Sequence, residues 1–213
     1  MIIFDFDGTI ADSLSALVTV TNRLAREYNY AEIDDSQVDQ LRQLSSRAII
    51  QRSNIPLLKV PFLMKRLRLE LSQEIKTIQP VPGIELALRQ LKAMGYPLGI
   101  VTSNSTSNVD EFLMHHQLTD LFDFTHSATT LFGKHRALRR LIRRRQLDPK
   151  AVIYVGDETR DIVSAHRIAI RVIAVTWGYN AKEILLQHQP DCLVHHSSDL
   201  ALAVQQLNRP APE

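Results

Sequence analysis

The feature of the sequence that most limits its fold is the alternation of short apolar runs with amphipathic segments from residue 84 onward. The runs are typical of buried strands; they are PLGIVT (97–102), FDFTH (122–126), AVIYV (151–155) and VIAVT (172–176), with a weaker run at 192–194. Segments with helical spacing of apolar residues separate them. Strands that alternate with helices predict an α/β protein: a Rossmann-like parallel sheet between two layers of helices.

The first strand of this sheet is expected at residues 2–6, far in sequence from the second strand. Between them, apolar residues recur every three or four positions and predict helices. The three apolar stripes are Leu14, Leu17, Val20, Leu24 and Tyr28; Leu41, Leu44 and Ala48; and Leu63, Leu67, Leu71, Ile75 and Ile78. The helical pattern ends at Pro80-Val81-Pro82-Gly83. We therefore expect a core of residues 1–13 and 81–213, with residues 14–80 inserted after the first strand as an α-helical cap.

Composition excludes several classes of protein. Of the 213 residues, 45% are hydrophobic and 23% are charged, which suits a folded domain and not a disordered chain. The net charge of +2 is too small to favour a nucleic acid or a membrane surface as partner. The single cysteine, Cys192, excludes an intrachain disulfide and is expected to be a structural residue. We see neither a membrane span nor a signal peptide and expect a cytoplasmic protein.

Polar and charged residues follow four of the expected segments. Asp5, Asp7 and Thr9 follow the first strand, and Thr102-Ser103-Asn104 closes the second; Gly133-Lys134, and then Asp157, Glu158 and Asp161, come later in the chain. In open parallel sheets the ligand sites form at the carboxyl ends of the strands. We therefore expect these residues to gather at one edge of the sheet.

The two aspartates of the first strand indicate a cation. Asp5 and Asp7 are two positions apart, so on extended backbone they face the same way. Carboxylates that are close together repel unless a cation or a proton lies between them. A hard divalent cation such as Mg²⁺ prefers oxygen ligands, and Asp157 and Asp161 could complete its shell. The adjacent pairs His115-His116 and His195-His196 are interpreted as surface residues.

Lys134 and Thr102 suggest what the cation would act on. A lysine near Mg²⁺ can hold a phosphate oxygen and neutralise developing charge. Thr102 and the N–H groups of Ser103 and Asn104 could bind the same oxygens, because a helix is expected to begin nearby. An aspartate, a cation, a lysine and a hydroxyl around one pocket suggest phosphoryl transfer through a carboxylate nucleophile.

At this point the sequence resembles a known family, the haloacid dehalogenase-like hydrolases. The resemblance rests on four motifs in the family's order: Asp5-Phe6-Asp7-Gly8-Thr9-Ile10, Thr102-Ser103-Asn104, Lys134, and Gly156-Asp157-Glu158-Thr159-Arg160-Asp161. It covers essentially the whole chain, and the nearest likeness is to phosphoglycolate phosphatase-like members with a small helical cap. The first motif is the most specific of the four.

The resemblance implies a Mg²⁺-dependent phosphatase that acts on a small phosphorylated metabolite through an aspartyl-phosphate. Asp5 would be the nucleophile, and Asp7 the general acid and base. The Asp5 carboxylate, the Asp7 carbonyl and Asp157 would bind the metal. The phosphate would be held by Thr102, Ser103, Asn104 and Lys134, and Thr9, Glu158 and Asp161 would support the site.

Other activities share these motifs. The second aspartate, Asp7, and the GDxxxD motif argue against a true haloacid dehalogenase, which resembles this chain in its nucleophile but needs no metal. A hexose-phosphate mutase of the same superfamily stays open, as does a catalytically idle phosphate-binding module. The sequence predicts neither the substrate nor whether the protein is a monomer or a homodimer.

Two arginine-containing segments are less specific. The run at 136–145 has six arginines, which we interpret as the solvated face of an amphipathic helix rather than as a patch for nucleic acid. In the expected cap, Arg47 is a candidate ligand for a substrate carboxylate, because a guanidinium suits that group.

Overall fold

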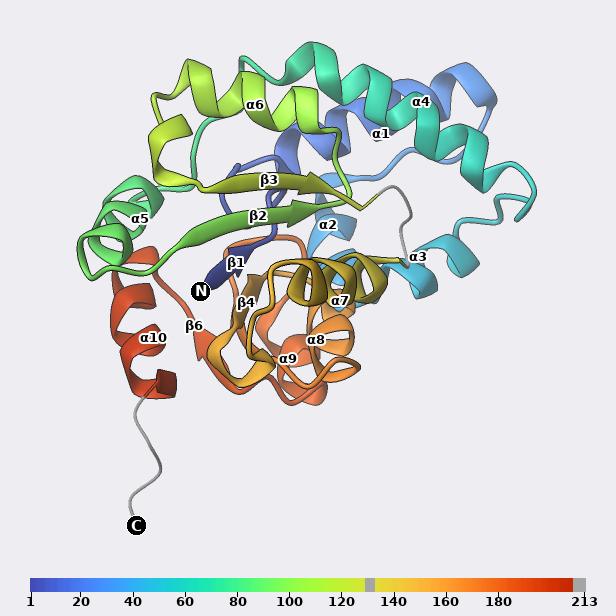
Figure 1. The fold of residues 1–213 in the computed structure, drawn as a ribbon. Coiled ribbons are helices and arrows are strands. Elements are labelled where there is room, and N and C mark those ends of the chain that lie inside the picture. Colours follow the sequence, from blue (N-terminus) through green and yellow to red (C-terminus); the bar gives the residue numbers. More distant parts are fainter. Residues whose placement is uncertain (129–132, 209–213) are drawn as a thin grey trace.

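The computed structural model describes residues 1–128 and 133–208 of the chain. Its centre is a six-stranded sheet in the order β3-β2-β1-β4-β5-β6, and every neighbouring pair of strands is parallel (Figure 1). The strands are β1 (Ile2–Phe4), β2 (Leu98–Thr102), β3 (Phe124–Ser127), β4 (Ile153–Gly156), β5 (Arg171–Val175) and β6 (Cys192–Val194). The predicted α/β class with a parallel, Rossmann-like sheet is confirmed.

Helices cover both faces of the sheet, and alternate residues of each strand pack against opposite layers. Phe4 packs in the cluster that includes α5 (Ile84–Ala93), α6 (Thr106–His115) and α10 (Leu200–Asn208). Its neighbour Ile3 packs in the second cluster, with α7 (Lys134–Arg144), α8 (Thr159–His166) and α9 (Lys182–Gln187). Because both faces of the central strands are covered in this way, their sequences are mostly apolar and do not alternate with polar residues. The described part of the core also contains three short 3₁₀ helices, at Thr119–Leu121, Pro149–Ala151 and Ser197–Asp199.

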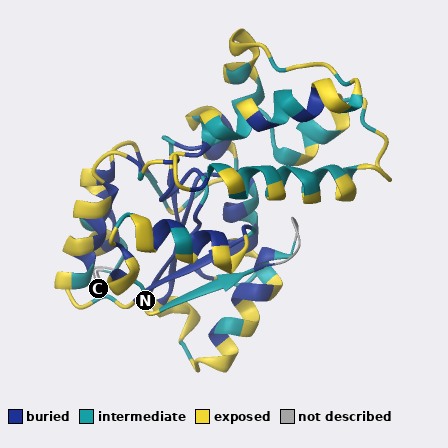
Figure 2. Ribbon diagram, turned by 90° about the horizontal axis from the view of Figure 1, so that it is seen from above, coloured by how far each residue is buried: buried dark blue, intermediate teal, exposed yellow. Residues whose placement is uncertain are grey.

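Four helices are inserted between β1 and β2. They are α1 (Leu14–Tyr28), α2 (Asp35–Arg42), α3 (Ser46–Arg52) and α4 (Val60–Glu74), and α1 packs along α4. They lie towards the carboxyl ends of the strands (Figure 1). Figure 2 shows that the sheet is mostly buried, whereas the inserted helices are mainly half-buried or exposed, with few buried residues. No helix of the described residues is both long and apolar enough to cross a membrane.

Two of the predicted helical stripes were wrong in their extent. The stripe of Leu41, Leu44 and Ala48 does not belong to one helix, because α2 ends at Arg42 and Ser45 begins α3 by accepting a hydrogen bond from the Ala48 N–H at 3.3 Å. The third predicted stripe, from Leu63 to Ile78, extends beyond its helix, because α4 ends at Glu74. Ile75 and Ile78 lie beyond it and pack in the core, which accounts for their apolar character.

The arginine-rich segment forms α7 and behaves as the amphipathic pattern predicts. Leu138 and Ile142 are buried, whereas all six arginines between 136 and 145 are exposed. The charge is therefore on a solvated face. Only the first turn of α7, which begins at Lys134, points its charge into the protein.

Candidate active site

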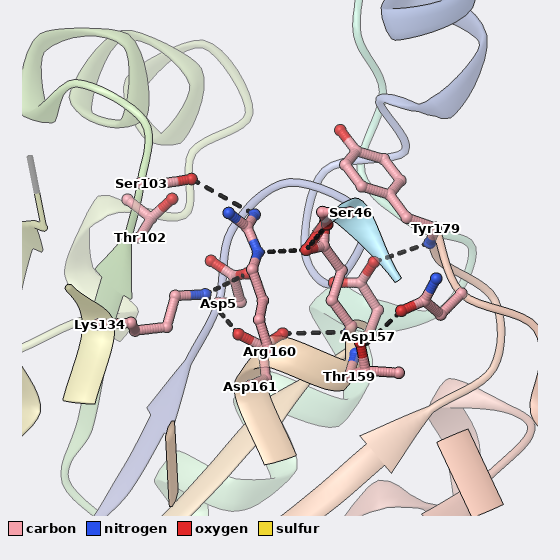
Figure 3. Close-up of polar contacts among 12 residues, drawn as sticks. Asp5, Ser46, Thr102, Ser103, Lys134, Asp157, Thr159, Arg160, Asp161 and Tyr179 are labelled. Carbon is pink, nitrogen blue, oxygen red and sulfur yellow. Dashed lines mark hydrogen bonds and ion pairs between the residues drawn. The ribbon is translucent and has the colours of Figure 1, made fainter. Parts of the chain in front are cut away.

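Three charged side chains from three separate elements form the centre of the site. Asp5 directly follows β1, Lys134 begins α7, and Asp161 lies in the first turn of α8. The Lys134 Nζ donates to an oxygen of Asp5 at 2.6 Å and to an oxygen of Asp161 at 2.5 Å. Each of the three residues is at most 2% exposed, and Figure 3 shows Lys134 reaching between the two carboxylates.

The charge of Lys134 is fixed by these two contacts. Burial alone would lower the pKa of Lys134, but the charges of Asp161 and Asp5 raise it on balance above its ordinary value. An ammonium group that is buried between two carboxylates stays protonated and holds both in place. Lys134 therefore fixes the position of Asp5 as well as balancing its charge.

Asp157 directly follows β4 and is completely buried. One of its oxygens accepts a hydrogen bond from the Thr9 hydroxyl at 2.7 Å, and the other accepts from the Tyr179 N–H at 2.7 Å. Burial, and then the charges of Glu158 and Asp161, raise the pKa of Asp157 well above its ordinary value. The ionised form of Asp157 is therefore energetically unfavourable in this position unless a further positive charge lies nearby.

The acidic residues could supply that charge by holding a metal ion. Oxygen atoms of Asp5, Asp157 and Asp161 lie within 4.8 Å of one another. A buried set of carboxylate oxygens is the donor set that a hard divalent cation prefers. The expected set differs in part, because the sequence analysis assigned the Asp7 carbonyl and gave Asp161 a supporting role.

Glycines around the carboxylates leave no room for side chains. A methyl group at Gly8, whose φ is +74°, or at Gly178 would overlap the Asp157 carboxylate, and one at Gly156 would overlap Asp161. Gly8 therefore meets two requirements at once, a left-handed backbone and close approach to Asp157. This crowding explains why the DxDGT motif has a glycine at this position.

Asp7 is held by a different partner. Its two oxygens accept hydrogen bonds from the Asn104 amide at 3.2 and 3.1 Å. The Asn104 amide oxygen accepts in turn from the Ser105 N–H and the Asn108 side chain, which fixes the direction of the amide. Burial, followed by the charge of Asp5, raises the pKa of Asp7 to about 6. Asp7 can therefore both hold and release a proton near neutral pH.

Two other residues expected to bind phosphate, Thr102 and Ser103, lie at the end of β2 and directly after it. Thr102 is buried, and its hydroxyl oxygen accepts the Asn104 N–H at 3.0 Å. The Asn104 N–H and side chain are thus occupied by Thr102 and Asp7. Ser103 is half-buried, and its hydroxyl lies 3.5 Å from the Arg160 guanidinium.

Arg160 is a functional candidate that the sequence analysis missed. It lies within the GDxxxD motif, and its guanidinium forms an ion pair with Glu158. Burial would lower its pKa, but the charges of Glu158 and Asp161 raise it, so the group stays charged. Figure 3 shows the guanidinium between Ser103 and Ser46, on the same side as Asp5. A cation in this position can contact an anionic substrate, and its place inside a recognised motif was the available signal.

Arg47, which the sequence analysis named as a candidate ligand for a substrate carboxylate, does not lie at the site. It is exposed on α3 and is absent from the described residues that line the cavity above the site. Its neighbour Ser46 is the one that reaches the site, because its hydroxyl donates to Glu158 at 3.3 Å.

The loop after β5 is a second feature that the sequence analysis left without a role. Besides the Tyr179 N–H, it provides Asn180, which accepts from the Thr159 N–H at 2.9 Å and donates to the Leu44 carbonyl at 2.9 Å. Arg42 of α2 donates back to the carbonyls of Thr176 and Gly178 at 3.2 and 3.0 Å. This loop therefore joins the inserted helices to the acidic site.

Replacement of Asp157 by asparagine is expected to raise the free energy of unfolding of the metal-free protein at neutral pH. A carboxyl whose pKa is higher in the folded than in the unfolded chain stabilises the fold below the unfolded pKa, and this contribution is lost as the pH rises through the folded pKa. Because the pKa of Asp157 is raised, Asp157→Asn should exceed the wild type in stability near neutral pH, and the difference should shrink towards acid pH. Each pKa unit corresponds to about 1.4 kcal/mol.

Urea unfolding in the presence of EDTA, at a series of pH values, measures this effect. Asp110→Asn, at an exposed position on α6, is the matched control and should change little. A variant at position 157 that is less stable than the wild type at neutral pH would show that the carboxylate is favourable where it lies.

Comparisons with a family model and with curated proteins point to the same family of proteins, and a solved structure of that family shares the fold of this chain. A family model described as haloacid dehalogenase-like hydrolase matches residues 2–175. The chain is 40% identical over 208 residues to a phosphoglycolate phosphatase from Synechococcus elongatus, covering 98% of both chains, and 29% identical to one from Aliivibrio fischeri, covering 90% of both. Among solved structures, a haloacid dehalogenase-like family hydrolase from Streptococcus pneumoniae superposes with a TM-score of 0.81 at 23% identity, over 96% of this chain and 97% of the other. That structural likeness concerns the fold.

Proposed function

Because the chain belongs to the haloacid dehalogenase-like hydrolases, we propose that it is a Mg²⁺-dependent phosphatase that hydrolyses a small phosphate monoester through a phosphorylated Asp5. The observation that carries the proposal is the different environment of the two aspartates of one motif. Asp5 contacts a buried ammonium group, whereas Asp7 is held by an amide and has a pKa of about 6. One is suited to attack as an anion, and the other to transfer protons.

The proposed reaction has two steps. In the first, an Asp5 oxygen bonds to phosphorus, the ester P–O bond breaks, and Asp7 gives its proton to the departing oxygen. In the second, a water molecule gives a proton to Asp7 and attacks phosphorus, which frees Asp5 and inorganic phosphate. Asp7 thus ends each cycle protonated, as it began, and no further reactant is needed.

Mg²⁺ is the proposed cofactor, held by Asp5 and Asp157 with the Asp7 carbonyl, and with Asp161 nearby. When bound, it would neutralise the carboxylates and the incoming phosphate. The support for this cofactor is the buried set of carboxylate oxygens and the raised pKa of Asp157. Lys134, Thr102 and Ser103 are proposed to hold the phosphate, with Thr9 and Glu158 supporting the site.

The substrate proposed first is a phosphorylated small acid such as phosphoglycolate, in line with the relative that is 40% identical. Arg160 is the proposed contact for the carboxylate, in place of Arg47, because its guanidinium is beside Ser103 and points into the site. We further propose that α1–α4 act as a cap that shields the reaction from water. A cytoplasmic location and a monomeric or homodimeric state stay predictions.

Phosphate release from 2-phosphoglycolate, with Mg²⁺ and then with excess EDTA, tests the proposal. The expected result is turnover that requires Mg²⁺ and returns when Mg²⁺ is added back. Turnover that persists unchanged in EDTA would contradict the metal assignment. In a second assay with a hexose phosphate, movement of the phosphate group to another position of the sugar without its release would favour the mutase.

A further inference from the structure

A cavity of about 270 Å³ opens beside Asp7 and extends between the inserted helices. On the side of the core it is lined by Asp7, Ser103, Asn104, Glu158 and Arg160. Deeper in, the lining is mainly apolar and includes Leu17, Leu41, Ile49, Ile50, Leu67 and Leu71. Its volume is just below the roughly 300–1,000 Å³ of ordinary ligand pockets.

The inserted helices are packed around this space and do not fill it. No residue of α2, α3 or α4, all of which the structure describes, is buried. Those leucines of the predicted apolar stripes that line the cavity, such as Leu17 and Leu67, are only half-buried. In an ordinary helical core such side chains are close-packed. Apolar surface left open in a protein interior is a feature of binding sites for apolar groups.

The position of the cavity relative to Asp7 identifies which part of a substrate would enter it. In the proposed reaction Asp7 protonates the leaving oxygen, so the group attached to that oxygen lies on the Asp7 side of the phosphate. The cavity begins at Asp7 and continues away from Asp5 and Lys134 towards the inserted helices. The leaving alcohol would therefore occupy the cavity.

We infer that the cavity receives an apolar leaving group, so that the protein also hydrolyses phosphate monoesters of short alkyl alcohols. The inference rests on the proposed phosphatase chemistry but not on phosphoglycolate as the substrate. A two-carbon acid such as glycolate would occupy only the polar mouth of the cavity. An alkyl chain of four to six carbons would reach the leucines and isoleucines, and each methylene group removed from water there favours binding. The bonds made and broken are those of the proposed reaction, and an alcohol and inorganic phosphate are released.

The test compares kcat/KM for ethyl, butyl and hexyl phosphate. The expected result is a rise of up to about fourfold for each methylene group. In Leu67→Trp the added ring should fill the cavity and lower kcat/KM for hexyl phosphate by about tenfold or more, while ethyl phosphate changes little. Leu69→Trp is the matched control, since Leu69 lies on the same helix with 50% exposure and should leave both substrates unaffected. Ile49→Phe provides a second filling variant if Leu67→Trp does not fold.

Binding of alkylphosphonates, which the proposed reaction cannot cleave, separates this inference from the proposed function. Hexylphosphonate should bind more tightly than ethylphosphonate to the wild type, and the difference should disappear in Leu67→Trp or Ile49→Phe. A chain-length effect in binding without any turnover would refute the phosphatase and keep the cavity assignment. Equal or falling kcat/KM and affinity with chain length would overturn the inference, even if phosphoglycolate is hydrolysed.

Discussion

Asp5→Asn is expected to lower turnover of any phosphate monoester by at least about 10⁴-fold, because the amide cannot attack phosphorus or leave it as a carboxylate does. The change keeps the shape of the side chain and leaves Lys134 its second carboxylate, Asp161, at 2.5 Å. We therefore expect the melting temperature to move by only a few degrees, which corresponds to about 1 kcal/mol in a chain of this size. The measurement pairs steady-state phosphate release with thermal unfolding.

Asp12→Asn is the matched control for this variant. Asp12 belongs to the same N-terminal segment but is exposed, so its replacement should leave turnover within about twofold, as for ordinary surface substitutions. Turnover by folded Asp5→Asn at the wild-type rate would rule out Asp5 as the nucleophile. Loss of folding in Asp5→Asn would instead show that this carboxylate is mainly structural.

Lys134→Met is expected to impair both activity and stability. The substitution keeps the apolar stem but removes the ammonium group that contacts Asp5 and Asp161, and it leaves two buried carboxylates without their partner. Breaking a buried ion pair by removal of one partner costs about 3–5 kcal/mol. For a chain of this size, this lowers the melting temperature by roughly 10 °C. Activity should fall as well, since Lys134 positions the attacking oxygen of Asp5.

Addition of Mg²⁺ to Lys134→Met tests the same prediction in a second way. If Asp5 and Asp157 hold the cation, Mg²⁺ should recover part of the stability that Lys134→Met has lost, because it returns positive charge to the same carboxylates. Lys182→Met is the matched control: Lys182 also begins a helix, α9, but it is exposed. A variant at position 134 that is as stable as this control would contradict the account of Lys134 as the link between Asp5 and Asp161.

The core of the fold could be predicted from the sequence because its four central strands, β1, β2, β4 and β5, are buried on both faces. The apolar runs at 97–102 and 151–155 correspond closely to β2 and β4. The carboxyl edge of such a sheet is the same for every strand, so the meeting of Asp5, Asp157 and Asp161 was predictable from topology. Neither step needed knowledge of side-chain packing.

The inserted helices and their contacts were less predictable, because they depend on packing between distant segments. Nothing local to Leu44 indicates that its carbonyl accepts from Asn180, a contact across 136 positions that lies at the break between α2 and α3. The partner of Asp7 was also missed. Asn104 was assigned to phosphate by its motif, whereas in the structure its amide donates to Asp7, the proposed general acid.

Chemical trapping of the phosphorylated residue tests the central claim most directly. Protein that is turning over a phosphate monoester with Mg²⁺ is quenched in acid, reduced with borohydride, digested, and examined by mass spectrometry. Borohydride reduces an acyl phosphate to an alcohol, so we expect residue 5 to be recovered in part as homoserine. Asp5→Asn and samples without substrate should give none. Reduction at a different carboxylate, or none at residue 5 in protein that is releasing phosphate under conditions that trap acyl phosphates, would contradict the account.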